Sequence, residues 1–206
     1  MTARWSWSRT LPRWSAPRWK WRSSQSPVPP SVGCCSGGRS RKGAVMSTIG
    51  WGFDAHRFGG EAPVLLAGVV VDARRGLVGT SDADVVAHAV ADALLGATAL
   101  GDLGTFFPSG DTRWQGVDSM ELLESVVSRC RAAGLIVDHV DVTVIAETVR
   151  ISPVREEIRR RLAGALKIDQ TAVSVKATST DGMGFTGRDE GIAAAAVVIG
   201  ELASVI

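Results

Sequence analysis

The chain has 206 residues, of which 45% are hydrophobic, and this length suits one domain with a buried core and leaves little room for a second. Residues 1–45 hold nine of the 23 Lys and Arg and none of the 21 Asp and Glu, so residues 46–206 carry a formal charge of −7 although the whole chain carries +2. The acidic charge of residues 46–206 argues against a nucleic-acid partner, and the lack of an apolar run of roughly 18–20 residues argues against a membrane partner.

Residues 1–45 differ in character from the rest of the chain. They repeat Arg-Trp, Ser and Pro without an apolar period, which predicts a disordered segment. Three interpretations remain open: a start codon upstream of the natural initiator Met46, a genuine disordered extension, or an organelle transit peptide, which the many Trp argue against. We therefore predict an extension at 1–45 and one domain at 46–206.

Cysteine usage and the absence of a signal sequence predict where the protein is located. Cys130 is the only cysteine of residues 46–206, so we expect no disulfide framework. The chain start also lacks the apolar stretch of a secretory signal. We expect a cytoplasmic protein, or a plastid protein if residues 1–45 are a transit peptide.

The first part of the domain predicts two strands and a helix. Short apolar stretches predict strands over residues 48–54 and 64–71. Ser81 and Asp84 have the spacing of an N-cap and its reciprocal carboxylate, and good helix formers follow, which predicts a helix from Ser81 to about Leu95. The glycines from Gly96 to Gly101 end this helix.

The second part of the domain alternates helices and strands. One apolar face predicts a helix from Ser119 that ends at Gly134. Alternating apolar and polar residues predict a strand over 140–146, followed by a helix over 153–166 and a strand over 173–177. Residues 192–199 favour a strand, although their alanines leave a helix open. This order predicts an α/β domain.

Three side chains form a candidate metal site. Asp54 and His56 lie two apart at the end of a predicted strand, so both point to one side of it. His88 lies inside the predicted helix, four residues from both Asp84 and Asp92. Alone, each feature is also typical of an ordinary surface, but together one carboxylate and two imidazoles with an open fourth position suit a catalytic Zn²⁺.

Two glycine-rich loops are candidates for binding. Residues 101–111 are long for a connection; the two Phe in them predict a packed loop, and Asp102 is a candidate to orient a ligand hydroxyl. Residues 176–188 follow a predicted strand with three consecutive hydroxyls, suited to phosphate oxygens. In the same loop Asp181 is a candidate to hold a hard cation such as Mg²⁺, and Arg188 to bind a phosphate. A plain turn remains the alternative for this loop.

Taken in order, these segments resemble the 2-C-methyl-D-erythritol 2,4-cyclodiphosphate synthase family. The resemblance extends from Ile49 to about Ile199, and several separate blocks carry it. They are Gly52-Phe53-Asp54-Ala55-His56, Ser81-Asp82-Ala83-Asp84, His88-Ala89-Val90-Ala91-Asp92-Ala93-Leu94-Leu95-Gly96, Gly101-Asp102-Leu103-Gly104, Phe107-Pro108, Gly184-Phe185-Thr186-Gly187-Arg188 and Glu190-Gly191.

The resemblance implies a divalent-metal-dependent lyase that cyclises a cytidyl diphosphate substrate and releases CMP. It implies an α/β (α+β) domain with a mixed four- to five-stranded sheet covered by helices on one face, assembled as a homotrimer with active sites between neighbouring subunits. It implies one Zn²⁺ per subunit on Asp54, His56 and His88, and Mg²⁺ or Mn²⁺ at Asp181 with the substrate diphosphate.

The resemblance also implies substrate-binding residues. It places the diphosphate and methylerythritol at Asp54, His56, Thr80, Ser81, Asp102, Leu103, Gly104, Phe107, Ser109 and Asp111. It places cytidine and its phosphates at Ala146, Arg150, Ile151, Thr178, Ser179, Thr180, Asp181, Phe185 and Arg188. Among these, Thr80 and Ser179 are our candidates for catalytic hydroxyls.

The chain departs from the family pattern at five positions. Thr80 stands where the family usually has His, and Ala83 where it has Gly. Val149 replaces a usual Pro, Ser109 a usual Asp, and Asp181 often a Glu. These changes bear on rate and metal preference. A zinc-dependent phosphodiesterase and a trimeric binding module for nucleotides or isoprenoid phosphates remain the alternative functions.

Overall fold

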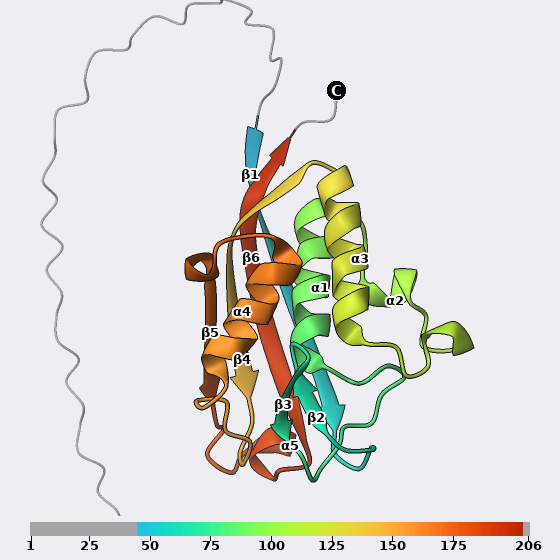
Figure 1. The fold of residues 1–206 in the computed structure, drawn as a ribbon, viewed down its shortest axis with the longest axis vertical. Helices are drawn as coiled ribbons and strands as arrows, with labels where there is room; N and C mark the ends of the chain where they lie inside the picture. Colours follow the sequence, from blue (N-terminus) through green and yellow to red (C-terminus); the bar gives the residue numbers. More distant parts are fainter. Residues whose placement is uncertain (1–44, 204–206) are drawn as a thin grey trace, which may run out of the picture. The chain divides into compact units, whose positions relative to one another are not determined.

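The computed structural model describes residues 45–203, which form a mixed four-stranded sheet with helices on one face (Figure 1). The strand order is β1 (Val45–Arg57), β6 (Gly191–Ala203), β4 (Leu135–Ile145) and β5 (Val173–Thr178). β6 is antiparallel to both of its neighbours, whereas β4 and β5 are parallel. Consequently β1, β4 and β5 run in the same direction, and their C-terminal ends lie at the same end of the sheet.

Three helices cover one face of this sheet: α1 (Val85–Thr98), α3 (Ser119–Ala132) and α4 (Arg155–Leu166). The backbones of α1 and β1 lie very close together at two glycines. A Cβ atom placed on Gly50 would lie 1.8 Å from the carbonyl oxygen of Ala93, and one placed on Gly52 would lie 2.1 Å from the carbonyl oxygen of Ala89. Only glycine permits this approach of helix to strand backbone. Leu94, Leu123 and Ile158 fill the core between the helices and the sheet.

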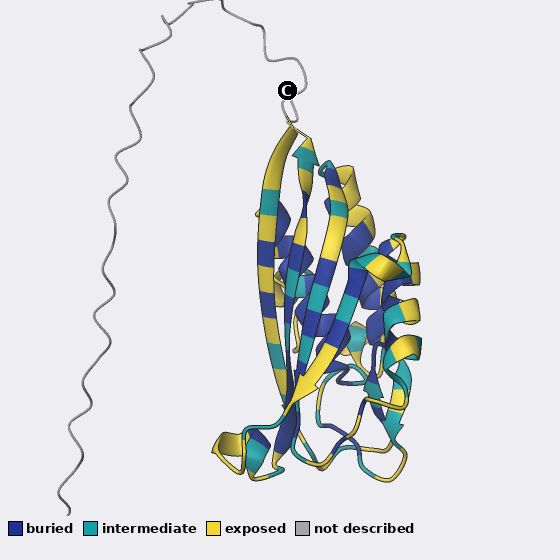
Figure 2. Cartoon of the chain, turned by 90° about the vertical axis from the view of Figure 1, so that its left-hand side faces the viewer, coloured by how far each residue is buried: buried dark blue, intermediate teal, exposed yellow. Residues whose placement is uncertain are grey.

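Within residues 45–203, no helix or loop covers the opposite face of the sheet. In Figure 2 exposed and buried residues alternate along the long strands, as expected for a sheet with one buried face. The outer face of β1 carries Ile49, Trp51 and Phe53, of which Trp51 is 64% exposed. Their partners on β6 are Ile199, Val197 and Ala195, so apolar side chains extend across both strands.

The remaining elements are short. β2 (Val64–Leu66) and β3 (Val69–Asp72) form a separate antiparallel pair. The loops between the large elements contain the helices α2 (Leu103–Phe106) and α5 (Gly184–Gly187) and the 3₁₀ turns η1 (Thr112–Trp114) and η2 (Gln170–Ala172).

Most of the predicted elements are confirmed, with two corrections. Residues 64–71 are two strands rather than one, because Ala67 and Gly68 adopt positive φ angles of 49° and 69° and turn the chain back. The N-cap of α1 is Asp84 rather than Ser81, since the Asp84 carboxylate accepts the amides of Val86 and Ala87. The question left open for residues 192–199 is settled in favour of a strand.

The domain boundary at Met46 stays a prediction. The predicted extension lies outside the described residues, except that β1 begins at Val45. Among residues 45–203, no helix is long and apolar enough to cross a membrane.

Candidate functional site

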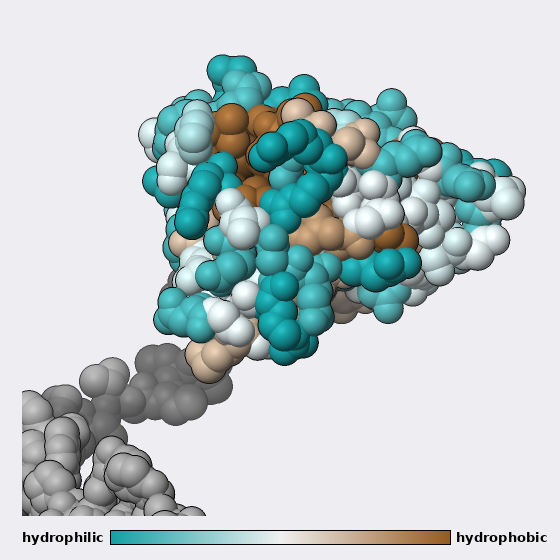
Figure 3. Space-filling model, turned by 90° about the horizontal axis from the view of Figure 1, so that it is seen from below, coloured by the Kyte–Doolittle hydropathy of each residue, from teal (hydrophilic) through white to brown (hydrophobic). Residues whose placement is uncertain are grey.

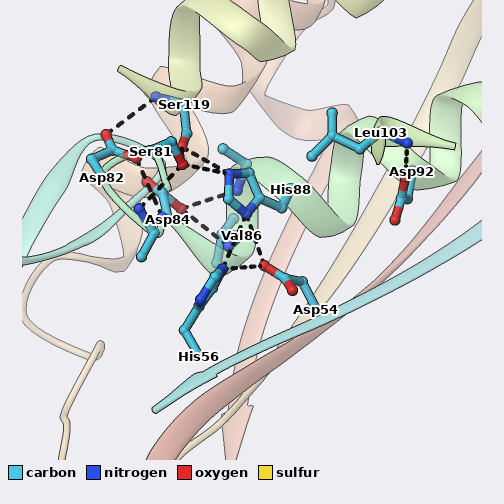
Figure 4. A network of polar contacts seen from close by, with 12 residues as sticks. Asp54, His56, Ser81, Asp82, Asp84, Val86, His88, Asp92, Leu103 and Ser119 are labelled. Atoms are coloured by element: carbon cyan, nitrogen blue, oxygen red, sulfur yellow. Dashed lines mark hydrogen bonds and ion pairs between the residues drawn. The ribbon is translucent and has the colours of Figure 1, made fainter. Parts of the chain in front are cut away.

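Asp54, His56 and His88 meet at one point between β1 and α1 (Figure 4). Oδ2 of Asp54 lies 3.1 Å from Nε2 of His56 and 2.8 Å from Nδ1 of His88, and the two imidazole nitrogens are 3.4 Å apart. Four tetrahedral ligands at the usual zinc bond lengths of about 2.0–2.1 Å lie roughly 3.3 Å from one another. The three atoms therefore have the spacing of zinc ligands, and the predicted cluster is confirmed as a candidate metal site.

The sheet and the helix each contribute to this geometry. Gly52, Asp54 and His56 alternate on the helix-facing side of β1, and the glycine brings α1 close enough for His88 to reach the two ligands. The three polar residues at four-residue spacing along α1 and its N-cap, Asp84, His88 and Asp92, make different contacts. Asp84 caps the helix and accepts the amide of Gly68 at 2.7 Å, which ties the β2–β3 turn to α1. His88 faces Asp54.

The last member of this polar stripe holds a loop. Asp92 Oδ1 accepts the backbone amide of Leu103 at 2.7 Å, at the beginning of α2. The helix that carries His88 therefore also fixes the loop that follows Gly101.

Hydrogen bonds orient His56 for metal binding. Its Nδ1 lies 2.7 Å from the carbonyl oxygen of Val78, which can only accept, so Nδ1 carries the proton. Nε2 is then free to bind a metal, and a backbone carbonyl is a usual outer partner of a metal-binding histidine.

The site is electrostatically prepared for a cation. Burial alone would raise the pKa of Asp54, but hydrogen bonds and charge attraction from His56 and His88 outweigh burial and hold this pKa far below its ordinary value. Burial lowers the pKa of His56, yet its contacts with Asp54 leave the net shift upward. Asp54 therefore stays ionised, and a bound metal would replace the histidine protons as its partner.

A cavity of about 200 Å³ adjoins the metal site. Its walls come from the loop before α1, from α2 with the residues after it, and from α3. They include six residues that the sequence predicted as substrate contacts besides His56: Thr80, Ser81, Leu103, Gly104, Phe107 and Ser109. The structure thus brings residues from distant parts of the chain into one hollow beside the three ligands.

Two further residues line this cavity and were not predicted, Trp114 and Leu122. The Trp114 ring meets the edge of Phe107 with centroids 4.9 Å apart. A lone Trp in the polar stretch 109–116 was a usable signal, because large apolar side chains in loops usually have a partner. Leu122 carried no such signal, since it belongs to the apolar face of a helix.

Two predicted residues of the 101–111 loop lie outside this cavity. The Asp102 carboxylate accepts the amide and hydroxyl of Thr105 at the start of α2, and Asp111 pairs with Arg113. Asp111 lines a neighbouring hollow of about 330 Å³ together with Thr80 and Ser109.

The residues predicted to bind cytidine gather at a second place, around the ends of β4 and β5. The Ala146 amide bonds to the Thr178 carbonyl at 3.1 Å, so the two loops leave the sheet together. Ser179 lies 3.3 Å from the Asp181 carboxylate. Thr180 bonds within its loop to Met183, and Arg188 pairs with Glu190 at 2.7 Å.

The remaining members of this group differ in exposure. Arg150 and Phe185 are exposed, whereas the side chain of Ile151 is buried, which leaves its backbone as the part able to touch a ligand.

These two groups of residues are separated in one chain. Asp54 pairs across the sheet with Ala194, which pairs with Val144, which in turn pairs with Ala177. Three strand spacings of about 4.8 Å place the end of β5 roughly 14 Å from Asp54.

Figure 3 views the molecule from the end at which β1, β4 and β5 finish. This surface is largely hydrophilic, with a few hydrophobic groups between polar ones.

One arginine links the loops of the second group. Arg75 donates to Asp189 and to Thr148, both at 2.8 Å, and Thr148 donates to Asp189 at 2.8 Å. Arg75 is itself held by Asp72 at 2.7 Å and lies over the ring of Phe58. The guanidinium therefore joins the loop after β4 to the segment after α5.

Known proteins share this sequence and fold. The sequence model of the YgbB family matches residues 47–201. A 2-C-methyl-D-erythritol 2,4-cyclodiphosphate synthase of Vibrio vulnificus is 49% identical over 154 residues, which cover 75% of this chain and 98% of that protein.

Two solved structures have a similar fold. The bifunctional IspDF from Campylobacter jejuni matches with a TM-score of 0.75 and 36% identity, and the match covers 77% of this chain and 43% of that longer chain. The CDP complex of IspF from Plasmodium falciparum matches with a TM-score of 0.65 and 26% identity over 76% of this chain and 96% of that one.

Proposed function

Since the chain belongs to the YgbB family, we propose that it converts 4-diphosphocytidyl-2-C-methyl-D-erythritol 2-phosphate to 2-C-methyl-D-erythritol 2,4-cyclodiphosphate with release of CMP. The enzyme is a cyclising phosphorus–oxygen lyase of the non-mevalonate isoprenoid pathway. The observation that carries the proposal is the three-ligand cluster of Asp54, His56 and His88, which opens onto a cavity lined by the predicted substrate residues.

The reaction needs no nucleophile from the protein. An oxygen of the substrate's own 2-phosphate bonds to the β-phosphorus, the bond from that phosphorus to the CMP oxygen breaks, and CMP leaves with the electron pair. Two anionic groups must approach each other, so positive charge at the β-phosphate is the main requirement. Because both groups belong to one molecule, holding it folded contributes about 7–11 kcal/mol when orientation is good.

We propose Zn²⁺ as the metal held by Asp54, His56 and His88. The donor set of two imidazoles and one carboxylate, and their mutual distances, fit zinc with one position left for substrate. When bound, the ion would supply Lewis-acid stabilisation of charge on a phosphoryl oxygen. The protein's own contribution is to orient both imidazoles and to keep Asp54 ionised.

The remaining predicted roles belong to hydroxyls and to a second cation. Thr80 lines the cavity beside His56, which supports our proposal that its hydroxyl donates to a phosphate oxygen there. Ser179 and Asp181 follow β5, where we propose that the hydroxyl binds the transferring phosphoryl group and the carboxylate holds Mg²⁺ or Mn²⁺ with the diphosphate. This second cation would offset charge on the departing CMP.

We also propose that the working enzyme is a homotrimer with active sites between subunits. The outer face of β1 and β6 carries neighbouring apolar side chains, with the rings of Trp51 and Phe53 stacked 6.1 Å apart. Single exposed apolar residues are ordinary, whereas a contiguous apolar patch indicates an interaction surface. The separation of the metal site from the β5 loop supports the same arrangement. A diphosphate substrate contacts both groups if the β5 loop of one subunit lies against the metal site of the next.

The test is to incubate the purified protein with the cytidyl substrate, Zn²⁺ and Mg²⁺ and to identify products by mass spectrometry. CMP together with a cyclic diphosphate supports the proposal. A linear product that contains one added water would instead show a phosphodiesterase, and bound substrate without CMP would show a binding module.

Replacement of His56 by Ala connects the reaction to the metal site. We expect this variant to lose both bound zinc and CMP release. His139→Ala is a matched control, because His139 lies exposed on β4 and is the only other histidine besides His88. Full turnover by zinc-free His56→Ala protein would overturn the metal role.

A further inference from the structure

The second ring nitrogen of His88 points away from Asp54 and into a buried group of hydroxyls (Figure 4). Nε2 lies 2.9 Å from Oγ of Ser119 and 3.1 Å from Oγ of Ser81. Ser119 is the first residue of α3 and only 1% exposed. Its hydroxyl is therefore shielded from water and makes its hydrogen bonds with neighbouring protein groups.

Asp82 determines the direction of these hydrogen bonds. One oxygen of its carboxylate makes a short hydrogen bond with the Ser119 hydroxyl, and the other accepts the Ser119 amide at 3.2 Å. A carboxylate only accepts, so the hydroxyl proton of Ser119 points to Asp82. The lone pairs of Ser119 Oγ are then what His88 meets.

This arrangement fixes a proton on Nε2 of His88. Because Ser119 can only accept from it, Nε2 must carry a ring proton, which leaves Nδ1, 2.8 Å from the Asp54 carboxylate, as the nitrogen that can exchange its proton for a metal. A ring that binds a metal through Nδ1 needs this form. We propose that Ser119 and Asp82 are positioning residues that hold His88 in the Nε2–H form and so prepare the metal site.

Ser81 is not equivalent to Ser119 in this arrangement. Its hydroxyl accepts the amide of Ala83 at 3.3 Å and lies 3.0 Å from Ser119 Oγ, but it makes no hydrogen bond to the Asp82 carboxylate. The direction of its hydrogen bond therefore follows from that of Ser119. The proposal deepens the proposed function, since it concerns the same metal site, but it does not depend on which substrate is bound.

The first experiment reads directly which ring nitrogens of His88 carry a proton. The chain has three histidines, so long-range ¹H–¹⁵N spectra of metal-free protein with ¹⁵N-labelled histidine can be assigned with single His→Gln variants. In this metal-free protein we expect Nε2 of His88 to carry a proton, whether or not Nδ1 also holds one toward Asp54. An Nε2 without a proton in the wild-type protein would overturn the proposal.

The Asp82→Asn variant should reverse the hydrogen bonds. The amide oxygen is needed by the Ser119 backbone N–H, so the amide NH₂ would face the Ser119 hydroxyl and turn its proton toward His88. We expect Nε2 of His88 to lose its proton and zinc binding to weaken. A proton that stays on Nε2 in the folded variant would contradict the proposed role of Asp82.

The second experiment measures zinc affinity by chelator competition, without substrate. Loss of an outer partner of a metal ligand typically lowers affinity about 10–100-fold, which we expect for Ser119→Ala. Ser128→Ala is the matched control, since Ser128 lies on the same helix and bonds only to the Glu124 carbonyl. Equal zinc affinities of the two variants, with metal-free proteins that melt cooperatively, would refute the role of Ser119.

Discussion

The replacement of Gly52 by alanine tests whether the metal site depends on the close approach of α1 to β1. A Cβ atom at this position would lie 2.1 Å from the Ala89 carbonyl oxygen and 2.6 Å from the Ala93 amide nitrogen. An ordinary contact begins at 3.4 Å, so relief of the first overlap needs a movement of about 1.3 Å between helix and strand. Both atoms in the way are backbone, so no side-chain rotation can relieve it.

The movement would separate the ligands. His88 precedes Ala89 on α1, whereas Asp54 and His56 belong to β1, and their ligand atoms now lie 2.8–3.4 Å apart. Metal–ligand distances vary by only about 0.2 Å, so a displacement near 1.3 Å takes His88 out of reach. We expect Gly52→Ala to lose most of its zinc and about 1–3 kcal/mol of stability through overpacking.

Gly96→Ala is the matched control on the same helix. A Cβ atom there would meet nothing closer than the Trp51 carbonyl oxygen at 3.8 Å, so the helix should gain about 0.5–1 kcal/mol and keep its zinc. The assay is zinc per chain by elemental analysis after dialysis, together with thermal melting of the metal-free proteins. A Gly52→Ala protein with wild-type zinc content would refute the argument.

Three further predictions concern metal, assembly and loop position. Removal of zinc by a chelator should abolish turnover and lower the melting temperature, because zinc at 100 times its Kd stabilises the folded state by about 2.7 kcal/mol. Equal melting temperatures with and without zinc would contradict binding at this site. Trp51→Glu places a charge on the exposed apolar face of the sheet, so light scattering should show loss of the proposed trimer, and turnover should fall with it. A fully active monomer would contradict sites shared between subunits. Asp189 has a positive φ of 54°, so Asp189→Gly should cost no backbone stability while releasing Arg75 and Thr148. Its expected effect is a higher KM for the cytidyl substrate with unchanged zinc content, and an unchanged KM would show that this contact does not position the loop.

The metal cluster could be predicted from the sequence because its geometry follows from two regular periods. Alternation in β1 places Asp54 beside His56, and the polar spacing on α1 marks His88 as a residue in need of a partner. The helix start was misplaced because Ser81 and Asp84 are both good caps. The structure assigns the cap to Asp84 and leaves Ser81 facing His88.

Other features depend on contacts between segments that no local pattern records. The turn at Ala67 and Gly68 is held from outside by Asp84, and alanine is not a turn signal, so residues 64–71 resembled one strand. Ser119 is an ordinary helix-start residue in the sequence. Its contact with His88 exists only because α3 packs beside α1.

The hydrogen bond from the Leu103 amide to Asp92 has a consequence for redesign of this enzyme. Since α1 fixes both the candidate metal ligand His88 and the beginning of α2, the proposed metal site and one wall of the cavity keep their relative positions through a single element. Asp92 should be retained in any variant library aimed at other polyol phosphates. Diversity belongs at Phe107, Ser109 and Trp114, whose side chains shape the hollow without carrying that connection.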